Sequence, residues 1–115
     1  MDALTRGNLY EGIPAVLPDE WFQTLLDDGT TRIERIVSLG HRSGDDFWFD
    51  QAWDEWVLLL KGGAGLAFAG AAEITVMAPG DWLRIPAGVK HRVEWTDPDG
   101  ETVWLAVHLR HSGPI

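Results

Sequence analysis

A series of short strand-like segments, separated by turn residues, is the feature that most constrains the fold of this chain. Eight such segments follow one another from residue 30 onward, and most end at a glycine. They cover residues 30–40, 47–51, 54–65, 65–70, 72–80, 81–88, 90–100 and 101–109. Strands of this length and spacing are typical of an antiparallel sandwich or barrel. No helix-length segment lies between them, as a parallel α/β sheet would require, so the sequence predicts an all-β domain.

A single short helix is predicted ahead of these strands. Pro18, Asp19 and Glu20 suit the first turn of a helix, and Asp28-Gly29 suits its end. Four apolar residues between them follow helical spacing: Trp21, Phe22, Leu25 and Leu26. We therefore expect residues 1–30 to form an N-terminal extension with a short helix, residues 31–111 the β-barrel, and residues 112–115 a tail.

Composition excludes several classes of protein. The net charge of −9, with nine scattered basic residues, argues against a nucleic-acid partner, because such partners are bound through clustered Lys and Arg. An acidic surface also repels anionic membranes. The chain has no cysteine, which excludes disulfides and thiolate metal sites. No leader-like segment or membrane-length apolar run is present, so a cytoplasmic location is expected.

The segment from Trp56 to Leu60 carries information about assembly. Its five residues are all apolar, so both faces of the strand must leave water. One face would line the interior of the barrel. The other needs a cover, which either the N-terminal segment or a partner subunit would provide. Seven tryptophans are many for one small core and favour a homodimer.

His91 is the first candidate for chemistry. It follows a tight Pro86-Ala87-Gly88 turn and opens the next strand. Alternation along that strand places His91, Val93 and Trp95 on the inward face, opposite the charged Arg92 and Glu94. We expect the imidazole to point into the barrel at its open end. The alternative is a hydrogen-bonded core histidine.

Glu55 is the second candidate. It lies beside Asp54 at the start of an apolar strand, between Trp53 and Trp56. A carboxylate in such a semi-apolar setting binds a cation or acts as a base with a raised pKa. The alternative is an ordinary solvated strand end.

These residues carry a resemblance to the cupin family. Gly80, Pro86, Gly88 and His91 match the spacing of the second cupin motif at every position, and Glu55 and Gly62 match the second half of the first motif. The resemblance implies a single small antiparallel β-barrel of the jelly-roll type, also described as a double-stranded β-helix. It also implies a ligand or metal site at the open end.

The first motif departs from the family pattern where cupins carry a histidine pair. Depending on the gap before Glu55, the pair falls either on Trp48 and Asp50 or on Phe49 and Gln51. The three-histidine, one-glutamate metal site of the family is therefore incomplete. The resemblance leaves Asp50, Glu55 and His91 as metal ligands, a set compatible with manganese, iron(II) or zinc. The residues expected to orient these ligands or to contact a small molecule are Trp48, Gln51 and His108.

Two functions compete at this stage. A divalent metal held by Asp50, Glu55 and His91 would serve a metal-dependent oxygenase or isomerase acting on a small molecule. Without a metal, the tryptophan-rich cleft would serve as a small-molecule binding or sensor module, with His91 and Gln51 forming hydrogen bonds to the ligand. Fold does not choose between these functions. A structural partner without a working site is the third alternative.

Overall fold

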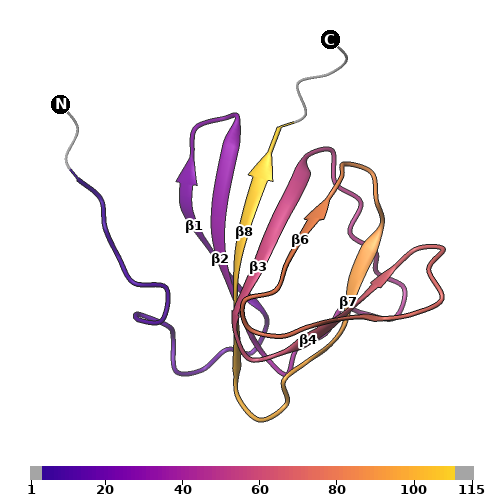
Figure 1. Ribbon diagram of the computed structural model, residues 1–115. Coiled ribbons are helices and arrows are strands. Elements are labelled where there is room, and N and C mark those ends of the chain that lie inside the picture. Colours follow the sequence, from indigo (N-terminus) through magenta and orange to yellow (C-terminus); the bar gives the residue numbers. More distant parts are fainter. Residues whose placement is uncertain (1–3, 111–115) are drawn as a thin grey trace.

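The computed structural model of the protein describes residues 4–110 (Figure 1). This part of the chain contains eight strands and no helix. The strands are β1 (Trp21–Asp27), β2 (Thr31–Leu39), β3 (Asp54–Lys61), β4 (Ala64–Phe68), β5 (Thr75–Met77), β6 (Trp82–Ile85), β7 (His91–Thr96) and β8 (Glu101–Leu109). The predicted tail at residues 112–115 lies outside the described residues.

The eight strands form two antiparallel sheets. The larger has the order β1-β2-β8-β3-β6 and the smaller the order β5-β4-β7. The prediction of an all-β fold is confirmed, but the pairing among these strands defines two sheets rather than one closed barrel. Apolar side chains from both sheets meet between them, among them Leu59, Leu66, Met77, Ile85 and Trp104. The core therefore lies between the sheets.

The predicted N-terminal helix is wrong, because residues 21–27 form strand β1. This strand pairs with β2, from Trp21 opposite Val37 to Asp27 opposite Arg32. The Asp28 carboxylate accepts hydrogen bonds from the backbone of the two threonines that follow Gly29, so Asp28-Gly29 forms a hairpin turn rather than a helix end. Trp, Phe and Thr favour strands, and pairing with a long neighbour outweighs the helical spacing of four residues.

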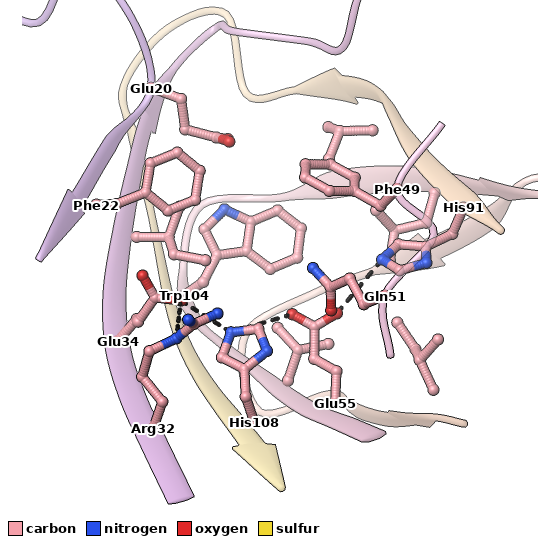
Figure 2. A pocket seen from close by; sticks show the side chains of 15 residues that line it. Glu20, Phe22, Arg32, Glu34, Phe49, Gln51, Glu55, His91, Trp104 and His108 are labelled. Atoms are coloured by element: carbon pink, nitrogen blue, oxygen red, sulfur yellow. Dashed lines mark ion pairs between the residues drawn. The ribbon is translucent and has the colours of Figure 1, made fainter. Parts of the chain in front are cut away.

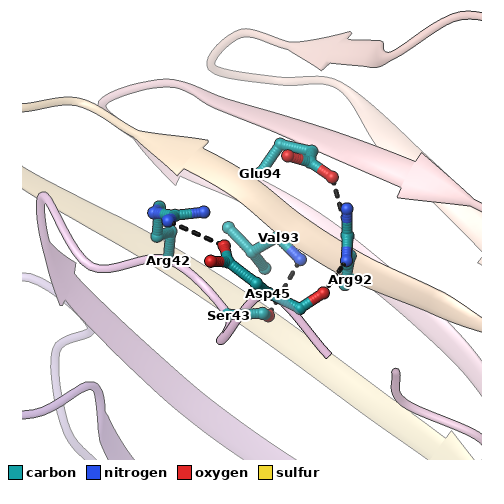
Figure 3. Close-up of polar contacts among 6 residues, drawn as sticks. All are labelled: Arg42, Ser43, Asp45, Arg92, Val93 and Glu94. Atoms are coloured by element: carbon teal, nitrogen blue, oxygen red, sulfur yellow. Dashed lines mark hydrogen bonds and ion pairs between the residues drawn. The ribbon is translucent and has the colours of Figure 1, made fainter. Parts of the chain in front are cut away.

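The strand predicted at 47–51 is present only as one isolated bridge, between Phe49 and His91. The chain before it is held along the free edge of β7 by individual contacts (Figure 3). The Ser43 backbone donates to the Val93 carbonyl at 2.9 Å, and the Val93 N–H donates to the Ser43 hydroxyl at 3.0 Å. The Arg92 guanidinium donates to the Asp45 carbonyl. These contacts fix the segment that leads to Phe49.

The predicted inward orientation of side chains along β7 is confirmed only in the first half of the strand. His91 is buried and Val93 lines the interior, but Trp95 is exposed. Gly65 of β4 pairs with Trp95 and the next residue, Leu66, pairs with Val93, so Glu94 is an extra residue in β7. Such a bulge reverses the alternation of side chains. Trp95 therefore covers Gly65 from outside the core.

The N-terminal segment covers part of the outer face of the larger sheet. Of the outward side chains predicted to need a cover, it reaches Leu60, whereas Trp56 and Leu58 stay half-buried. Leu17 packs against Val37 and Val103 there, with Trp21 at the edge of the same cluster. Arg35 of β2 holds this segment in place and is itself only 4% exposed. Its guanidinium donates to the carbonyls of three residues of the segment: Asn8, Leu9 and Glu11. The homodimer stays a prediction.

We expect Arg35→Met to lower the free energy of unfolding by about 2 kcal/mol, because hydrogen bonds from a charged donor contribute about 1.5–3 kcal/mol. The methionine keeps much of the side-chain volume but leaves the three carbonyls without their donor. Urea denaturation followed by tryptophan fluorescence measures the change. Arg42→Met is the control, since Arg42 is half-exposed, and it should change stability by less than about 0.5 kcal/mol. Equal losses in both variants would contradict this role of Arg35.

Within residues 4–110, no helix has the length and apolar character needed to cross a lipid bilayer.

Candidate functional site

A pocket of about 250 Å³ lies between the two sheets. Its walls come from the inner faces of β2, β3 and β8 on one side, and from β7 with the segment at residues 49–51 on the other. Five ionisable residues from the strands line it: Arg32, Glu34, Glu55, His91 and His108. Figure 2 shows them with the aromatic residues that complete the walls.

The register of the larger sheet explains why polar groups gather at one end of this pocket. Arg32 lies opposite His108, which lies opposite Glu55 on the next strand. One row deeper the residues are Glu34, Ala106 and Val57, and below them are Ile36, Trp104 and Leu59. Because side chains on one face recur every second residue, each strand changes from polar to apolar as it enters the core. The sheet thus presents ionisable groups at one end of the pocket and apolar side chains beyond them.

Glu55 and His91 meet across the pocket, as the sequence predicted. The His91 Nδ1 donates to the Val89 carbonyl at 3.0 Å, because a carbonyl can only accept. The other ring nitrogen, Nε2, lies 3.3 Å from Glu55 Oε1, and both side chains are buried. In a neutral ring this Nε2 would direct a lone pair at a carboxylate oxygen. A proton must therefore lie between the two groups, held by the imidazole or by the carboxyl.

The surroundings of His91 favour its protonated form. Burial is the largest influence and lowers the pKa of His91, but three others oppose it: the hydrogen bond to Glu55, the hydrogen bond to the Val89 carbonyl and the charge of Glu55. Together they raise the pKa of His91 above its ordinary value. A histidine of this kind is available as a proton donor near neutral pH.

This shift predicts a pH dependence of stability. A group whose pKa is raised in the folded state stabilises the fold fully below its unfolded value, about 6.5 for histidine, and less as pH rises through the folded value. The unfolding free energy of the wild type should therefore fall, relative to His91→Gln, as pH increases above about 6.5. Urea denaturation of both proteins between pH 6 and pH 9 measures the difference. A difference that stays constant or widens with pH would contradict the raised pKa.

His108 and Arg32 extend the contact between Glu55 and His91 into a series of basic and acidic side chains. The His108 Nε2 lies 2.9 Å from Glu34 Oε1 and 4.0 Å from Glu55 Oε2, although its N–H is not aligned for a hydrogen bond to Glu34. Arg32 Nε lies 3.4 Å from the same Glu34 oxygen. Bases therefore alternate with carboxylates from Arg32 to His91 (Figure 2). This order places a basic group between the two carboxylates.

Glu20 adds a third carboxylate to the pocket. Burial raises the pKa of Glu20, opposed by a hydrogen bond from Ser38 and by the charge of His41. The Ser38 hydroxyl donates to Glu20 Oε2 at 2.6 Å. Ser38 lies on β2, while Glu20 directly precedes β1, so the β1–β2 hairpin positions this carboxylate.

Aromatic rings and two polar atoms complete the walls. Phe22, Phe49 and Trp104 line the pocket, and Phe49 stacks on the His91 ring with centroids 5.4 Å apart. The Trp104 Nε1 and the Gln51 Oε1 are buried and have no hydrogen-bond partner within the described chain. Buried polar atoms are nearly always hydrogen-bonded in native proteins, so these two atoms call for partners from outside the chain.

The structure separates the predicted site residues into two groups. Glu55, His91, Gln51 and His108 line the pocket. Asp50 is exposed and does not line it. Trp48 also lies outside the pocket lining. The Arg92 Cζ lies over its ring, 4.7 Å from the ring centroid. Phe49 and Gln51, rather than their neighbours, therefore face inward.

The inward residues do not fit a tightly bound divalent metal. Within residues 4–110, no three His, Asp or Glu side chains are arranged to hold an ion. The predicted set of Asp50, Glu55 and His91 is not brought together, since Asp50 faces outward. One inward position of the missing histidine pair carries the apolar ring of Phe49. Structural and catalytic metal sites usually use three or four donors. Glu55 and His91 approach each other to 3.3 Å, but the second imidazole, His108, lies 4.0 Å from Glu55 and against Glu34.

Four pocket residues were not singled out from the sequence: Glu20, Arg32, Glu34 and Trp104. For two of them the sequence shows an alternation, of Arg32, Glu34 and Ile36 with Ile33, Arg35 and Val37, but it does not show which set faces inward. Both faces of β2 carry charged and apolar residues. The N-terminal segment covers the face that carries Arg35, and only this cover shows that the face with Arg32 and Glu34 is the internal one.

No protein-family model matches this chain, and no curated protein does. Solved structures do match. A protein of Ralstonia eutropha JMP134, named a "putative mannose-6-phosphate isomerase", is 47% identical, with a TM-score of 0.90 over 94% of this chain and 100% of its own. A cupin superfamily protein of Desulfitobacterium hafniense DCB-2 is 20% identical, with a TM-score of 0.71 over 86% of this chain and 84% of its own. A cupin domain of Bordetella pertussis Tohama I is also 20% identical, with a TM-score of 0.64 over 82% and 96%. With the motif residues from Gly80 to His91 in place, the chain is a small cupin-fold protein.

Proposed function

We propose that this cupin protein binds a small organic molecule in the pocket between its sheets and transfers protons to and from it through Glu55 and His91. The observation that carries the proposal is the contact between His91 Nε2 and Glu55 Oε1 at 3.3 Å. Since Nδ1 donates to Val89, this pair holds one exchangeable proton beside the pocket. Paired groups of this kind serve as acid and base in enzymes.

The proposed reaction is an isomerisation next to a carbonyl group. The Glu55 carboxylate takes a proton from the carbon beside the carbonyl, while protonated His91 gives its Nε2 proton to the carbonyl oxygen. An enediol forms, with Glu55 protonated and His91 neutral. The reverse transfers, at the other carbon and oxygen, complete the isomerisation and restore both groups. No net charge is created in the pocket at any step.

Two further observations support this reaction class. The raised pKa of His91 favours the protonated form of the acid, and the His108 ring lies near the free Glu55 oxygen. The name of the Ralstonia eutropha relative also refers to a sugar isomerase. The metal-dependent form of this reaction has less support, because Asp50 faces away and Phe49 occupies an inward position.

Deuterium incorporation tests the proposal. The full chain is incubated in D₂O with a panel of hydroxyaldehydes and hydroxyketones, and loss of the proton next to the carbonyl is followed by NMR. We expect exchange above the buffer rate with at least one compound. No exchange with any compound would overturn the reaction. A stoichiometric metal that is lost in His91→Gln would replace it with metal-dependent chemistry.

A metal-free binding or sensor module is the second candidate. It is favoured by the unpartnered Trp104 Nε1 and Gln51 Oε1, which would bind a ligand whether or not a reaction follows. Binding without deuterium exchange would select this function.

A further inference from the structure

We infer that the ligand of this pocket is an uncharged, hydroxyl-rich molecule, such as a free sugar or polyol, and not a phosphate ester. The inference rests on the proposed function, because it names the ligand class of the same site. It comes from two features of the pocket: the hydrogen-bonding atoms that the chain leaves without partners, and the charges that are already neutralised.

Four pocket residues carry a buried polar atom without a partner in the described chain: Arg32, Gln51, Trp104 and His108. Two of these atoms, on Trp104 and Gln51, require an acceptor and a donor respectively. Trp104 is only 4% exposed, lines the pocket and carries an indole N–H without an acceptor in the described chain. An indole nitrogen can only donate, so the ligand must offer an acceptor there. Gln51 Oε1 can only accept, so the ligand must offer a donor. Hydroxyl groups do both, whereas an ammonium group cannot accept.

Polar side chains lie on both sides of the pocket. In Figure 2, Glu20 and Phe22 lie on the opposite side of the pocket from Gln51, Glu55 and His91. A ligand that reaches both sides must therefore carry several polar groups along its length. Between them it meets the flat apolar faces of Phe49 and Trp104, which suit the carbon skeleton of a sugar ring or polyol chain.

The charges of the pocket argue against a phosphate ester. Arg32 is the one Lys or Arg side chain among the described residues that line it, and Glu34 pairs with Arg32 at 3.4 Å. The imidazole of His91 is paired with Glu55, and that of His108 lies against Glu34. Three carboxylates line the same pocket. No helix in the described chain offers its N-terminus to an anion.

A phosphate monoester carries about 1.5 to 2 negative charges at pH 7 and needs charged donors when buried. Here Arg32, His91 and His108 each lie within 3.4 Å of a carboxylate oxygen, so a phosphate would compete with these carboxylates, although the Nε atoms of Arg32 and His108 make no hydrogen bond in the described chain. The pocket therefore selects against the substrate class that the name of the Ralstonia eutropha relative suggests.

Isothermal titration of the full chain tests the inference with matched probes: D-mannose and D-fructose against their 6-phosphates. We expect the free sugars to bind at least tenfold more tightly. Trp104→Phe, which removes the N–H and keeps an aromatic ring, should weaken free-sugar binding about fivefold, the equivalent of one hydrogen bond of about 1 kcal/mol. Trp82→Phe is the control, because Trp82 is exposed and outside the pocket lining, and it should change affinity less than twofold.

Equal or tighter binding of the sugar phosphates would overturn the ligand class. So would an absence of free-sugar binding, or equal effects of the two tryptophan variants. The proton-transfer proposal is judged separately, by deuterium exchange with the carbonyl panel. A protein that exchanges deuterium but prefers phosphorylated sugars would keep its proposed function and lose this inference.

Discussion

Glu55→Gln should reduce the rate of deuterium exchange by about 100- to 10,000-fold, the usual contribution of a positioned acid or base. Glutamine preserves the volume and the planar end group of the side chain, but it cannot take a proton from carbon. His91→Gln should lose as much, because it removes the acid that protonates the carbonyl oxygen. The NMR exchange assay measures both rates, and circular dichroism checks that each variant is folded.

Two comparisons make this prediction specific to the pair. Glu101→Gln removes a carboxylate that pairs with Lys61 on the surface, and it should keep the wild-type rate. The double variant of Glu55 and His91 should be no slower than either single variant, since the effects of substituting two groups that act as one unit do not add. More than a tenth of wild-type activity in Glu55→Gln would show that another group is the base. Additive losses would show that the two residues act independently.

The turn before β7 was predictable from sequence because its constraints are local. Gly88 has a positive φ of 80°, which glycine adopts readily, and the Gly88 N–H donates to the Gln51 carbonyl at 2.8 Å. The turn therefore aims His91 into the core and holds the segment at residues 49–51 beside it. The spacing from Pro86 to His91 contained this information. The meeting of Glu55 and His91 was instead an expectation of the resemblance to the two cupin motifs, which carry these residues.

The rest of the site depended on pairing between distant segments. Whether Asp50 or Gln51 faces inward is decided by the bridge between Phe49 and His91, and the spacing before Glu55 allowed both. The strand β1 shows the same limit, because its helical spacing was overridden by pairing with β2. In each case the deciding partner lies outside the local sequence window. Local patterns could therefore identify candidate residues, but not which neighbours surround them.

Gly62→Ala should be strongly destabilising, with a loss of about 3–5 kcal/mol in the free energy of unfolding. Gly62 follows β3 directly and has a φ of 90°, in the left-handed region that disfavours residues with a Cβ. A Cβ here would lie 2.5 Å from Thr102 Oγ1, 2.7 Å from the Glu101 carbonyl oxygen and 2.8 Å from Thr102 Cα. Two of these atoms belong to the backbone of β8, which is fixed between β2 and β3 and cannot move aside.

Gly70→Ala separates the two causes of this loss. Gly70 has a similar φ of 84°, but a Cβ there would meet nothing within 4 Å. Its loss should therefore be the backbone cost alone, about 1–2 kcal/mol. Urea denaturation of both variants gives the difference, which measures the close approach of the Gly62 turn to β8. Equal losses would mean that β8 yields at Thr102. In that case the glycine of the first cupin motif would be required only for its positive φ. The strand that carries Trp104 and His108 into the pocket would then be held less rigidly than its packing indicates.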